Sequence, residues 1–396
     1  VGAGCVGVVV MLVPVCGGSP AVSMPVYRDT IDRTLNMQRH VMRENIATSS
    51  LGKIAGCKTE SKRNICSSEL DHRFWSCATD CKVDRMSGIM VRTVLALILA
   101  VLSSSGKASE NLALKTTKAD VGQLLVIQRH PIDSSHVYTY HTEGFRPGGG
   151  LFVFTPKTGE LRRLVDAGEG QIQDCDLSYD GKTVLFSWKT SKDNGYHLFT
   201  INADGTERRQ LTDGRWHDYN ACWLPDGGIA FLSTRSARFA YCWVSPVGLL
   251  YRMDADGSNV RRLSANIVND FTPSVLSDGR IIYSRWEYVD KPAIPIQSLW
   301  TINPDGTGLA GYYGNRVLSP ATFMEARSIP GTTKVLCMLT AHNGPARGAV
   351  GIIDRAHGVN AQAAIRNLTP EINIGKVDKG DGNNVKGPYS TPYPLD

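Results

Sequence analysis

The sequence predicts an all-β protein, a β-propeller of four-stranded blades, and two repeated phrases support this fold class. The first phrase is a strand, a tight Asp-Gly turn and a second strand, and it is clearest at Leu250–Leu263. Glycine is favoured at the second turn position because that position needs a positive φ, which glycine adopts at no steric cost. The phrase occurs three times, with turn glycines at Gly205, Gly257 and Gly306, so its period is 52 and then 49 residues.

The second phrase interleaves with the first and consists of an apolar strand, a turn and a strand of β-branched and aromatic residues. Its turn glycines are Gly181, Gly227 and Gly279, with a degenerate copy at Gly331, and they are spaced by 46, 52 and 52 residues. Two hairpins about every 50 residues make a four-stranded unit, the repeat of a propeller blade. The alternative is a sandwich with unrelated Asp-Gly hairpins, but a sandwich does not explain why two independent phrases keep one period.

Length and charge limit the classes of function. With 396 residues, of which 42% are hydrophobic, the chain is long enough to bury at least one large core. Residues 1–108 hold 13 Lys and Arg against 8 Asp and Glu, a net charge of +5, whereas residues 109–396 hold 30 against 29. The positive charge therefore belongs to the leader, and the repeat region lacks the basic bias that binds nucleic acid.

Residues 1–85 show neither helical nor strand periodicity and hold six of the ten cysteines. We expect them to be a non-native or disordered extension, because the chain begins with Val rather than Met and no regular pattern follows. The alternative is that Val1–Cys16 is an N-terminal membrane or lipoprotein segment. Val13–Val15 is a poor match to the small residues expected before a lipidated cysteine.

Residues 86–108 are predicted to be a secretory signal peptide. Arg92 supplies positive charge, Val94–Leu102 is an apolar run, and Gly106 and Ala108 have the spacing of an Ala-x-Ala-like cleavage site. The run is too short to cross a bilayer as a helix. The sequence therefore predicts a periplasmic or extracellular protein that starts near Ser109 and has no membrane segment apart from the signal peptide. Its four remaining cysteines are expected to be buried in strands rather than bridged.

Residues 109–120 are expected to be a linker, and residues 121–396 the propeller. A first, atypical unit covers residues 121–166. Regular units follow at about 171–214, 216–265, 268–317 and 320–368. We expect this propeller of about five units to be truncated, that is, incomplete at its C-terminus, because Pro392–Asp396 resembles the start of another unit.

Aligning the units on their turn glycines brings polar residues to one level of the predicted central channel. Seven residues before the glycines stand Asp174, Asn220, Thr272 and Met324, and nine before them stand Asp218 and Asp270. The first strand of each blade lines the axis of a propeller. We therefore expect a ligand site at the channel mouth, for a cation or a polyol, made by Asp174, Asp218, Asn220 and Asp270. The alternative is that these side chains cap the entries to the strands.

A second candidate site lies in the polar stretch that follows the first strand of the atypical unit. It consists of His130, His136, His141 and Glu143. These residue types bind metals or transfer protons, but neither His-x-x-x-His nor His-Glu-x-x-His is present, so we predict no metal site. We also predict no cofactor and no catalytic residues. Cys-x-x-Cys-His, a phosphate loop, a dinucleotide fingerprint and Gly-x-Ser-x-Gly are all absent from the sequence.

Particular runs carry a resemblance to a known family. They are His130–His136, Glu143–Leu151, His217–Gly227, Ala240–Pro246 and Ser284–Tyr288. Together with the alternating turn phrases, these runs resemble the middle domain of the hydrazine synthase alpha subunit, a TolB-like propeller of exported, mostly planctomycete-type proteins. The resemblance covers roughly residues 121–396.

The resemblance implies a scaffold rather than a reaction. In hydrazine synthase the middle propeller joins haem-bearing domains that combine nitric oxide and ammonium, whereas this sequence has no haem-attachment motif. We therefore predict an exported scaffold or binding domain, non-catalytic by itself, whose partner is a protein or an associated haem-bearing domain or subunit. The alternative is a fragment of a larger c-type haem redox protein whose haem domains lie beyond residue 396. A sugar- or peptide-cleaving enzyme is a third class, supported only by the channel carboxylates.

Overall fold

The computed structural model describes residues 7–13, 122–241, 243–288, 296–317, 319–375 and 385–394. The chain divides into two compact units, Val1–Cys16 with Leu112–Asp396, and Gly17–Asn111. The second unit, which includes the predicted signal peptide and most of the predicted extension, lies outside the described residues. In the described part of the chain, no helix is both long and apolar enough to cross a membrane.

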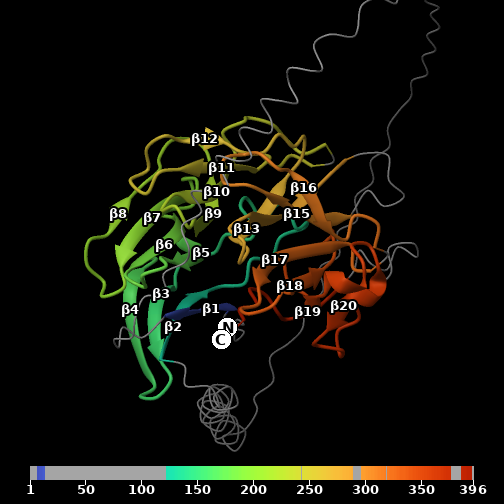
Figure 1. Ribbon diagram of the computed structural model, residues 1–396. Helices are drawn as coiled ribbons and strands as arrows, with labels where there is room; N and C mark the ends of the chain where they lie inside the picture. Colours follow the sequence, from blue (N-terminus) through green and yellow to red (C-terminus); the bar gives the residue numbers. More distant parts are fainter. Residues whose placement is uncertain are drawn as a thin grey trace, which may run out of the picture. The chain divides into compact units, whose positions relative to one another are not determined.

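The described residues form four-stranded antiparallel sheets that follow one another in chain order (Figure 1). The first sheet contains β1 (Gly7–Val13), β2 (Gln123–Arg129), β3 (Gly150–Thr155) and β4 (Glu160–Asp166). The second contains β5 (Gln171–Leu177), β6 (Thr183–Lys189), β7 (His197–Asn202) and β8 (Arg209–Gln210). The third contains β9 (Asp218–Trp223), β10 (Ile229–Ser233), β11 (Leu249–Met253) and β12 (Arg261–Arg262).

Two further sets of four strands complete the series. One contains β13 (Asp270–Val275), β14 (Ile281–Trp286), β15 (Gln297–Ile302) and β16 (Ala310–Tyr313). The other contains β17 (Thr322–Ser328), β18 (Val335–Thr340), β19 (Ala349–Ile353) and β20 (Ile365–Asn367), with the short 3-10 helices η1 (Arg355–His357) and η2 (Gln362–Ala364) before β20. A single parallel pair, Gln297 opposite Thr322, joins β15 to β17, so the two sets share hydrogen bonds.

The turns that define the repeat are confirmed. In the first phrase, Gly205, Gly257 and Gly306 have φ values of 95°, 90° and 92°. The aspartate before each glycine also caps its turn, as Asp204 does when its Oδ1 accepts a hydrogen bond from the Thr206 N–H at 2.8 Å. In the second phrase, φ is also positive at Gly181, Gly227, Gly279 and Gly331. In the six turns that contain Asp-Gly, the pair therefore specifies the turn through both the side chain of the aspartate and the φ of the glycine, whereas the Gly331 turn has a proline in place of the aspartate.

The hydrophobic core lies between neighbouring sheets. Leu125 of β2 packs in one buried cluster with Val184 and Phe186 of β6, which joins the first sheet to the second. All five residues of β10, Ile229–Ser233, are buried. A strand that is buried on both faces is expected where its sheet packs against a neighbour on each side. This packing fixes the positions of the inner strands.

The first strands of four successive sheets, β5, β9, β13 and β17, lie side by side at the centre of the arrangement (Figure 1). Neighbouring first strands are tied by side chains, since Asp176 Oδ2 accepts a hydrogen bond from the Trp223 N–H at 2.8 Å. Farther along, Ser274 Oγ donates to the Ala326 carbonyl at 2.5 Å. The sheets therefore have a propeller-like arrangement, in which no sheet closes on itself.

Strand β1 falls within residues 1–85, the predicted extension. It pairs with β2 along its whole length, with Gly7 opposite Arg129 and Val13 opposite Gln123. That residues 1–85 are not part of the natural protein stays a prediction. Of the repeat-region cysteines, Cys175, Cys222 and Cys337 are buried in β5, β9 and β18, and Cys242 lies outside the described residues.

Candidate binding cavity

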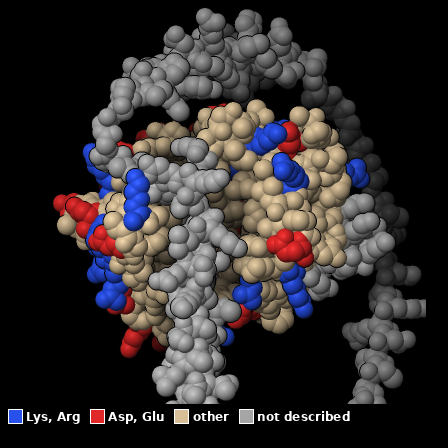
Figure 2. Space-filling view, turned by 90° about the horizontal axis from the view of Figure 1, so that it is seen from below, with Lys and Arg blue, Asp and Glu red and all other residues tan. Residues whose placement is uncertain are grey.

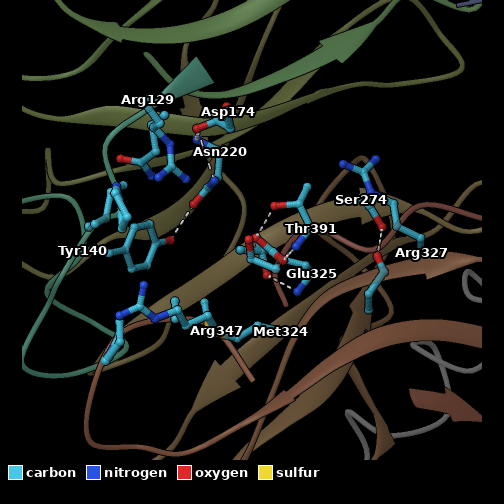
Figure 3. Close-up of a pocket in the computed structure, with 18 of the residues that line it drawn as sticks. Arg129, Tyr140, Asp174, Asn220, Ser274, Met324, Glu325, Arg327, Arg347 and Thr391 are labelled. Atoms are coloured by element: carbon cyan, nitrogen blue, oxygen red, sulfur yellow. Dashed lines mark hydrogen bonds between the residues drawn. The ribbon is translucent and has the colours of Figure 1, made fainter. Parts of the chain in front are cut away.

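A cavity of about 680 Å³ opens where the first strands meet. Residues of β5, β9, β13 and β17 form its wall, together with the end of β2, the loop before β19 and residues 385–391. In the close-up, Arg129 of β2, Glu325 of β17 and Thr391 of residues 385–391 face this common space (Figure 3). Acidic and basic side chains are interspersed on the face of the described part seen in Figure 2. That face therefore has no patch of a single sign.

The structure places two of the four predicted channel residues together in the cavity wall. Asp174 Oδ2 accepts hydrogen bonds from the backbone N and the Nδ2 of Asn220, at 2.9 and 3.2 Å. Asp174 Oδ1 accepts from Ser187 Oγ at 2.7 Å. Asn220 Oδ1 in turn accepts from Tyr140 Oη at 2.5 Å (Figure 3). The Asp174–Asn220 pair thus links two neighbouring first strands at the cavity.

The other two predicted residues, Asp218 and Asp270, do not line the cavity. Both are fully buried. Asp218 Oδ2 accepts a hydrogen bond from Arg235 Nη2 at 2.9 Å, and Asp270 accepts from Ser264 Oγ and from Asn266 Nδ2. The four residues therefore do not converge, and the predicted channel-mouth cluster is reduced to Asp174 and Asn220.

A β-bulge in β9, β13 and β17 explains why the residue seven positions before the turn glycine faces the cavity and the residue nine positions before it does not. The strand register shifts near Asn220, Thr272 and Glu325, where two residues of the first strand oppose one of the second. These three residues also have positive φ, of 48°, 42° and 53°. A bulge breaks the strict alternation of side chains along a strand. The bulge therefore turns Asn220 and Thr272 toward the cavity and leaves Asp218 and Asp270, two positions earlier, between sheets.

The bulges also repeat one contact between neighbouring units. At two of the three bulges the backbone N–H of the bulge residue donates to a side chain of the preceding first strand, Asn220 to Asp174 and Glu325 to Thr272 Oγ1 at 2.8 Å. Thr391, with a φ of 51°, makes the same contact with the carboxylate of Glu325. Residues 385–391 therefore occupy the place of a further first strand at the cavity.

The sequence did not indicate most of the charged and amide side chains that line the cavity. The cavity is also lined by Arg129, Gln173, Glu325, Arg327 and Arg347. Aligning the turns did identify the position along each first strand that faces the cavity, because Thr272 and Met324 line the cavity as well. Glu325 directly follows Met324, and only the bulge exposes both to the cavity. Arg129 and Arg347 come from segments outside the regular repeat, so no periodic signal marked them.

Burial raises the pKa values of the two lining carboxyl groups. The pKa of Asp174 rises to about 6, although hydrogen bonds from Ser187 and Asn220 oppose the effect of burial. Burial likewise raises the pKa of Glu325 above its ordinary value, against hydrogen bonds from Thr391. A carboxyl group in a low-dielectric site favours its neutral form. Asp174 therefore titrates close to neutral pH.

Two of the three lining arginines are paired with carboxylates. Arg327 Nη1 lies 3.6 Å from Asp176 Oδ1, and Arg347 Nη2 lies 2.9 Å from Asp133 Oδ1. Arg129 differs, because burial lowers its pKa and outweighs the opposing influence of Tyr196, Glu325 and Asp174. Its Nε is buried and has no hydrogen-bond partner among the described residues.

The second candidate site lies in the β2–β3 loop, residues 130–149, which borders the cavity through Pro131, Ile132 and Tyr140. Its His141 is buried and stacks on Tyr219 with ring centroids 4.8 Å apart. Burial, and then the neighbouring His217, lowers the pKa of His141 well below its ordinary value. The imidazole is therefore a neutral core group at physiological pH.

The remaining members of the second site lie elsewhere. His136 packs against the rings of Tyr138, Trp243 and His342. Glu143 holds its own loop together. Its carboxylate accepts hydrogen bonds from Ser135 N and Thr139 Oγ1, both at 2.7 Å, and from Trp243 Nε1 at 3.1 Å. His130 is exposed. Nowhere among the described residues do three His, Cys, Asp or Glu side chains form a group that could hold a metal ion.

No family model matches the chain. Dipeptidyl-peptidase 5 from Porphyromonas gingivalis is 39% identical over 69 residues, which are 16% of this chain and 10% of that protein. The chain thus spans a small part of this curated relative.

Solved structures give a broader likeness. Hydrazine synthase from Kuenenia stuttgartiensis is 17% identical with a TM-score of 0.49, over 63% of this chain and 39% of that one. TolB from Acinetobacter baumannii is 14% identical with a TM-score of 0.37, over 60% and 58%. Because both scores are below 0.5, the case for a propeller-like fold rests on the sheets and their repeat.

Proposed function

We propose that this chain is an exported propeller domain that binds a small polar ligand in its central cavity and is non-catalytic by itself. The observation that carries the proposal is the cavity of about 680 Å³ whose wall holds polar side chains from four first strands. Ligand pockets of several hundred Å³ with a few convergent polar groups are the usual form of a small-molecule site.

The lining chemistry supports binding rather than catalysis. No histidine is found among the described residues that line the cavity. The lining Ser274 donates its hydroxyl to the Ala326 carbonyl, and burial raises the pKa of the lining Cys175 thiol. A thiol nucleophile is activated by a lowered pKa and a serine by a base that takes its proton, whereas the pKa of Cys175 is raised and the Ser274 hydroxyl donates to a backbone carbonyl.

The same proposal includes a ring of blades and a docking partner. The two phrases with one period and the propeller-like series of sheets support a ring of blades around the cavity. The place of residues 385–391 beside β17 supports one further blade position. The resemblance to the hydrazine synthase alpha middle domain supports a scaffold that docks on a protein or on a haem-bearing domain or subunit outside the cytoplasm.

A ligand screen on the full chain tests the binding function. Polyols, organic acids and divalent cations are added separately, and the melting temperature is measured for the wild type, Ala346→Trp and Ala356→Trp. Ala346 lines the cavity, so its replacement by Trp fills the site, whereas Ala356 is exposed on η1 and serves as the matched control. At a hundredfold excess over Kd, a ligand stabilises by about 2.7 kcal/mol, which corresponds to a rise on the order of 5 °C.

The proposal predicts that at least one solute raises the melting temperature of the wild type and of Ala356→Trp but not of Ala346→Trp. Equal shifts in all three chains, or none in any, would refute it. The redox alternative has its own test. A stoichiometric Soret absorbance in the chain purified from cells that mature cytochromes would favour that alternative.

A further inference from the structure

The carboxylate oxygens that line the cavity are all engaged by donors of the protein itself. Both oxygens of Asp174 accept hydrogen bonds, from Ser187 on one side and from Asn220 on the other. Both oxygens of Glu325 accept hydrogen bonds from Thr391, through its backbone N–H and its Oγ1. A cation would have to compete with these internal donors for the same carboxylates.

The unused capacity belongs instead to Gln173 and Arg129. Gln173 is 4% exposed and lines the cavity, yet neither its Nε2 nor its Oε1 has a partner among the described residues. The same holds for Arg129 Nε, and within the described part of the chain this guanidinium makes one hydrogen bond, a 3.4 Å contact from Nη1 to the His130 carbonyl. Buried polar groups without partners are rare in folded proteins, because each costs about 1–3 kcal/mol.

Both residues line the cavity from neighbouring strands. Gln173 lies on β5, and Arg129 is the last residue of β2, which packs beside β5. Arg129 is also the lining arginine for which no ion pair with a described carboxylate is recorded, since Arg327 and Arg347 are bound to Asp176 and Asp133. The lining therefore offers a guanidinium that has no ion pair among the described residues and, on the neighbouring strand, an amide whose two Nε2 donors and Oε1 acceptor have no described partner.

Resting on the binding function proposed above, we propose that the cavity ligand is a small hydroxycarboxylate, held by Arg129 and Gln173. The planar guanidinium matches the two oxygens of a carboxylate. The Gln173 amide supplies a donor through Nε2, and its Oε1 accepts from the hydroxyl of the ligand. This assignment replaces the cation or polyol expected from the sequence, because the carboxylates that favoured a cation are already satisfied within the protein.

Isothermal titration of the full chain at about pH 7 tests the assignment, with L-malate as the probe. Arg129→Gln should weaken malate binding by about tenfold or more, because a charge-assisted hydrogen bond contributes about 1.5–3 kcal/mol. Gln173→Leu should weaken it by roughly fivefold, the effect of one or two neutral hydrogen bonds. The control Arg163→Gln removes an exposed arginine of β4 that pairs with Asp166, and should leave the Kd unchanged.

Other probes distinguish a failure of the hydroxycarboxylate assignment from a failure of the binding function. Malamide, the neutral diamide of malate, should not bind measurably. If sorbitol or Ca²⁺ binds in place of malate and Ala346→Trp abolishes that binding, the binding function stands and the hydroxycarboxylate is refuted. If inorganic phosphate binds more tightly than malate, the carboxylate assignment is likewise refuted. If no probe binds the wild type, both proposals are refuted.

Folding of the variants is checked by their melting curves. Should Arg129→Gln not fold, Arg129→Lys keeps the charge and loses the planar fork. The assignment then predicts that this variant binds malate about tenfold more weakly than the wild type. Unchanged affinity in Arg129→Lys together with unchanged affinity in Gln173→Leu would overturn the assignment.

Discussion

At the scale of single residues, the cavity is shaped by buried polar side chains that hydrogen-bond one another across strands. Tyr140 of the β2–β3 loop donates to Asn220 of β9, and Asn220 donates to Asp174 of β5. Three segments far apart in sequence thus meet in one chain of hydrogen bonds. Such networks are strong when every member is satisfied and costly when one is removed.

Removing the Tyr140 hydroxyl tests this network. Tyr140→Phe deletes the 2.5 Å hydrogen bond to Asn220 Oδ1, so we expect the free energy of unfolding to fall by about 1 kcal/mol. The matched control is Tyr241→Phe, at a tyrosine that is 63% exposed, where the change should be within about 0.5 kcal/mol. Denaturant unfolding measures both values, and equal losses in the two variants would contradict the network.

The raised pKa of Asp174 predicts a pH dependence of stability. Between its ordinary value of 3.8 and its folded value of about 6, the folded chain keeps a proton that the unfolded chain has lost. Folding takes up this proton, so the free energy of unfolding falls as pH rises through this window and the loss is complete above about pH 6.

The side chain of Asp174→Asn cannot ionise, so this variant should lack the pH-dependent part of the free energy of unfolding that comes from Asp174. Relative to the variant, the wild type should therefore lose on the order of 2 kcal/mol between about pH 4 and pH 7. Unfolding titrations at a series of pH values measure the difference. Asp166→Asn, at an exposed aspartate of β4, is the control and should follow the wild type. Parallel curves for wild type and Asp174→Asn would show that Asp174 is not buried in this way.

At the scale of elements, the turn spacing predicts the level of the cavity but not the direction of each side chain. Asp174, Asn220, Thr272 and Met324 all line the cavity as their common offset indicates. Asp218 and Asp270, two positions earlier, would share that face in a regular strand, and the bulges turn them away. Thr and Glu do not favour positive φ, so nothing at positions 272 and 325 signals a bulge. Tertiary packing imposes it.

The position of Arg129 depends on Gly149. A Cβ at Gly149 would lie 1.9 Å from the Gln128 carbonyl oxygen, and its φ is +81°. Gly159 offers a matched control, because its φ is +72° and a Cβ there would meet nothing within 4 Å. Gly159→Ala should cost about 1–2 kcal/mol, the price of a left-handed residue alone.

Gly149→Ala should cost clearly more than Gly159→Ala, because the strand end beside Arg129 must also move. Chemical denaturation measures the two losses, and malate titration reports whether Arg129 has been displaced. If both variants lose the same stability and Gly149→Ala keeps full affinity for malate, the close approach of Gly149 to β2 does not position Arg129.

At the scale of the whole molecule, the repeat predicts the four-stranded units and their turns because both depend on local chemistry, an Asp-Gly pair and an alternating strand. The contacts that complete the cavity are not local. His141 Nε2 meets the Pro246 carbonyl 105 positions away, and the His130, His136 and His141 stretch, which looks like a polar loop, buries one of its histidines among aromatic rings. Sequence periodicity carries no information on such contacts.

Strand β1 gives a prediction about assembly. It covers the edge of β2 over seven paired positions, and a protein that starts near Ser109 lacks it. A bare strand edge pairs readily with other chains. We therefore expect residues 109–396 to self-associate as concentration rises in sedimentation velocity, and the full chain to do so less. A monodisperse monomer of residues 109–396 at every concentration would show that another segment covers β2.

The central claim is that Arg129 binds an anionic ligand in the cavity. The most direct measurement is the ¹⁵N–¹H NMR signal of its side-chain Nε–H. The signal is assigned by its absence in Arg129→Lys and followed in the wild type during titration with L-malate, sorbitol and Ca²⁺. The account predicts that malate shifts this signal and that sorbitol and Ca²⁺ leave it in place. A signal that stays unchanged at a malate concentration that raises the melting temperature would contradict the account.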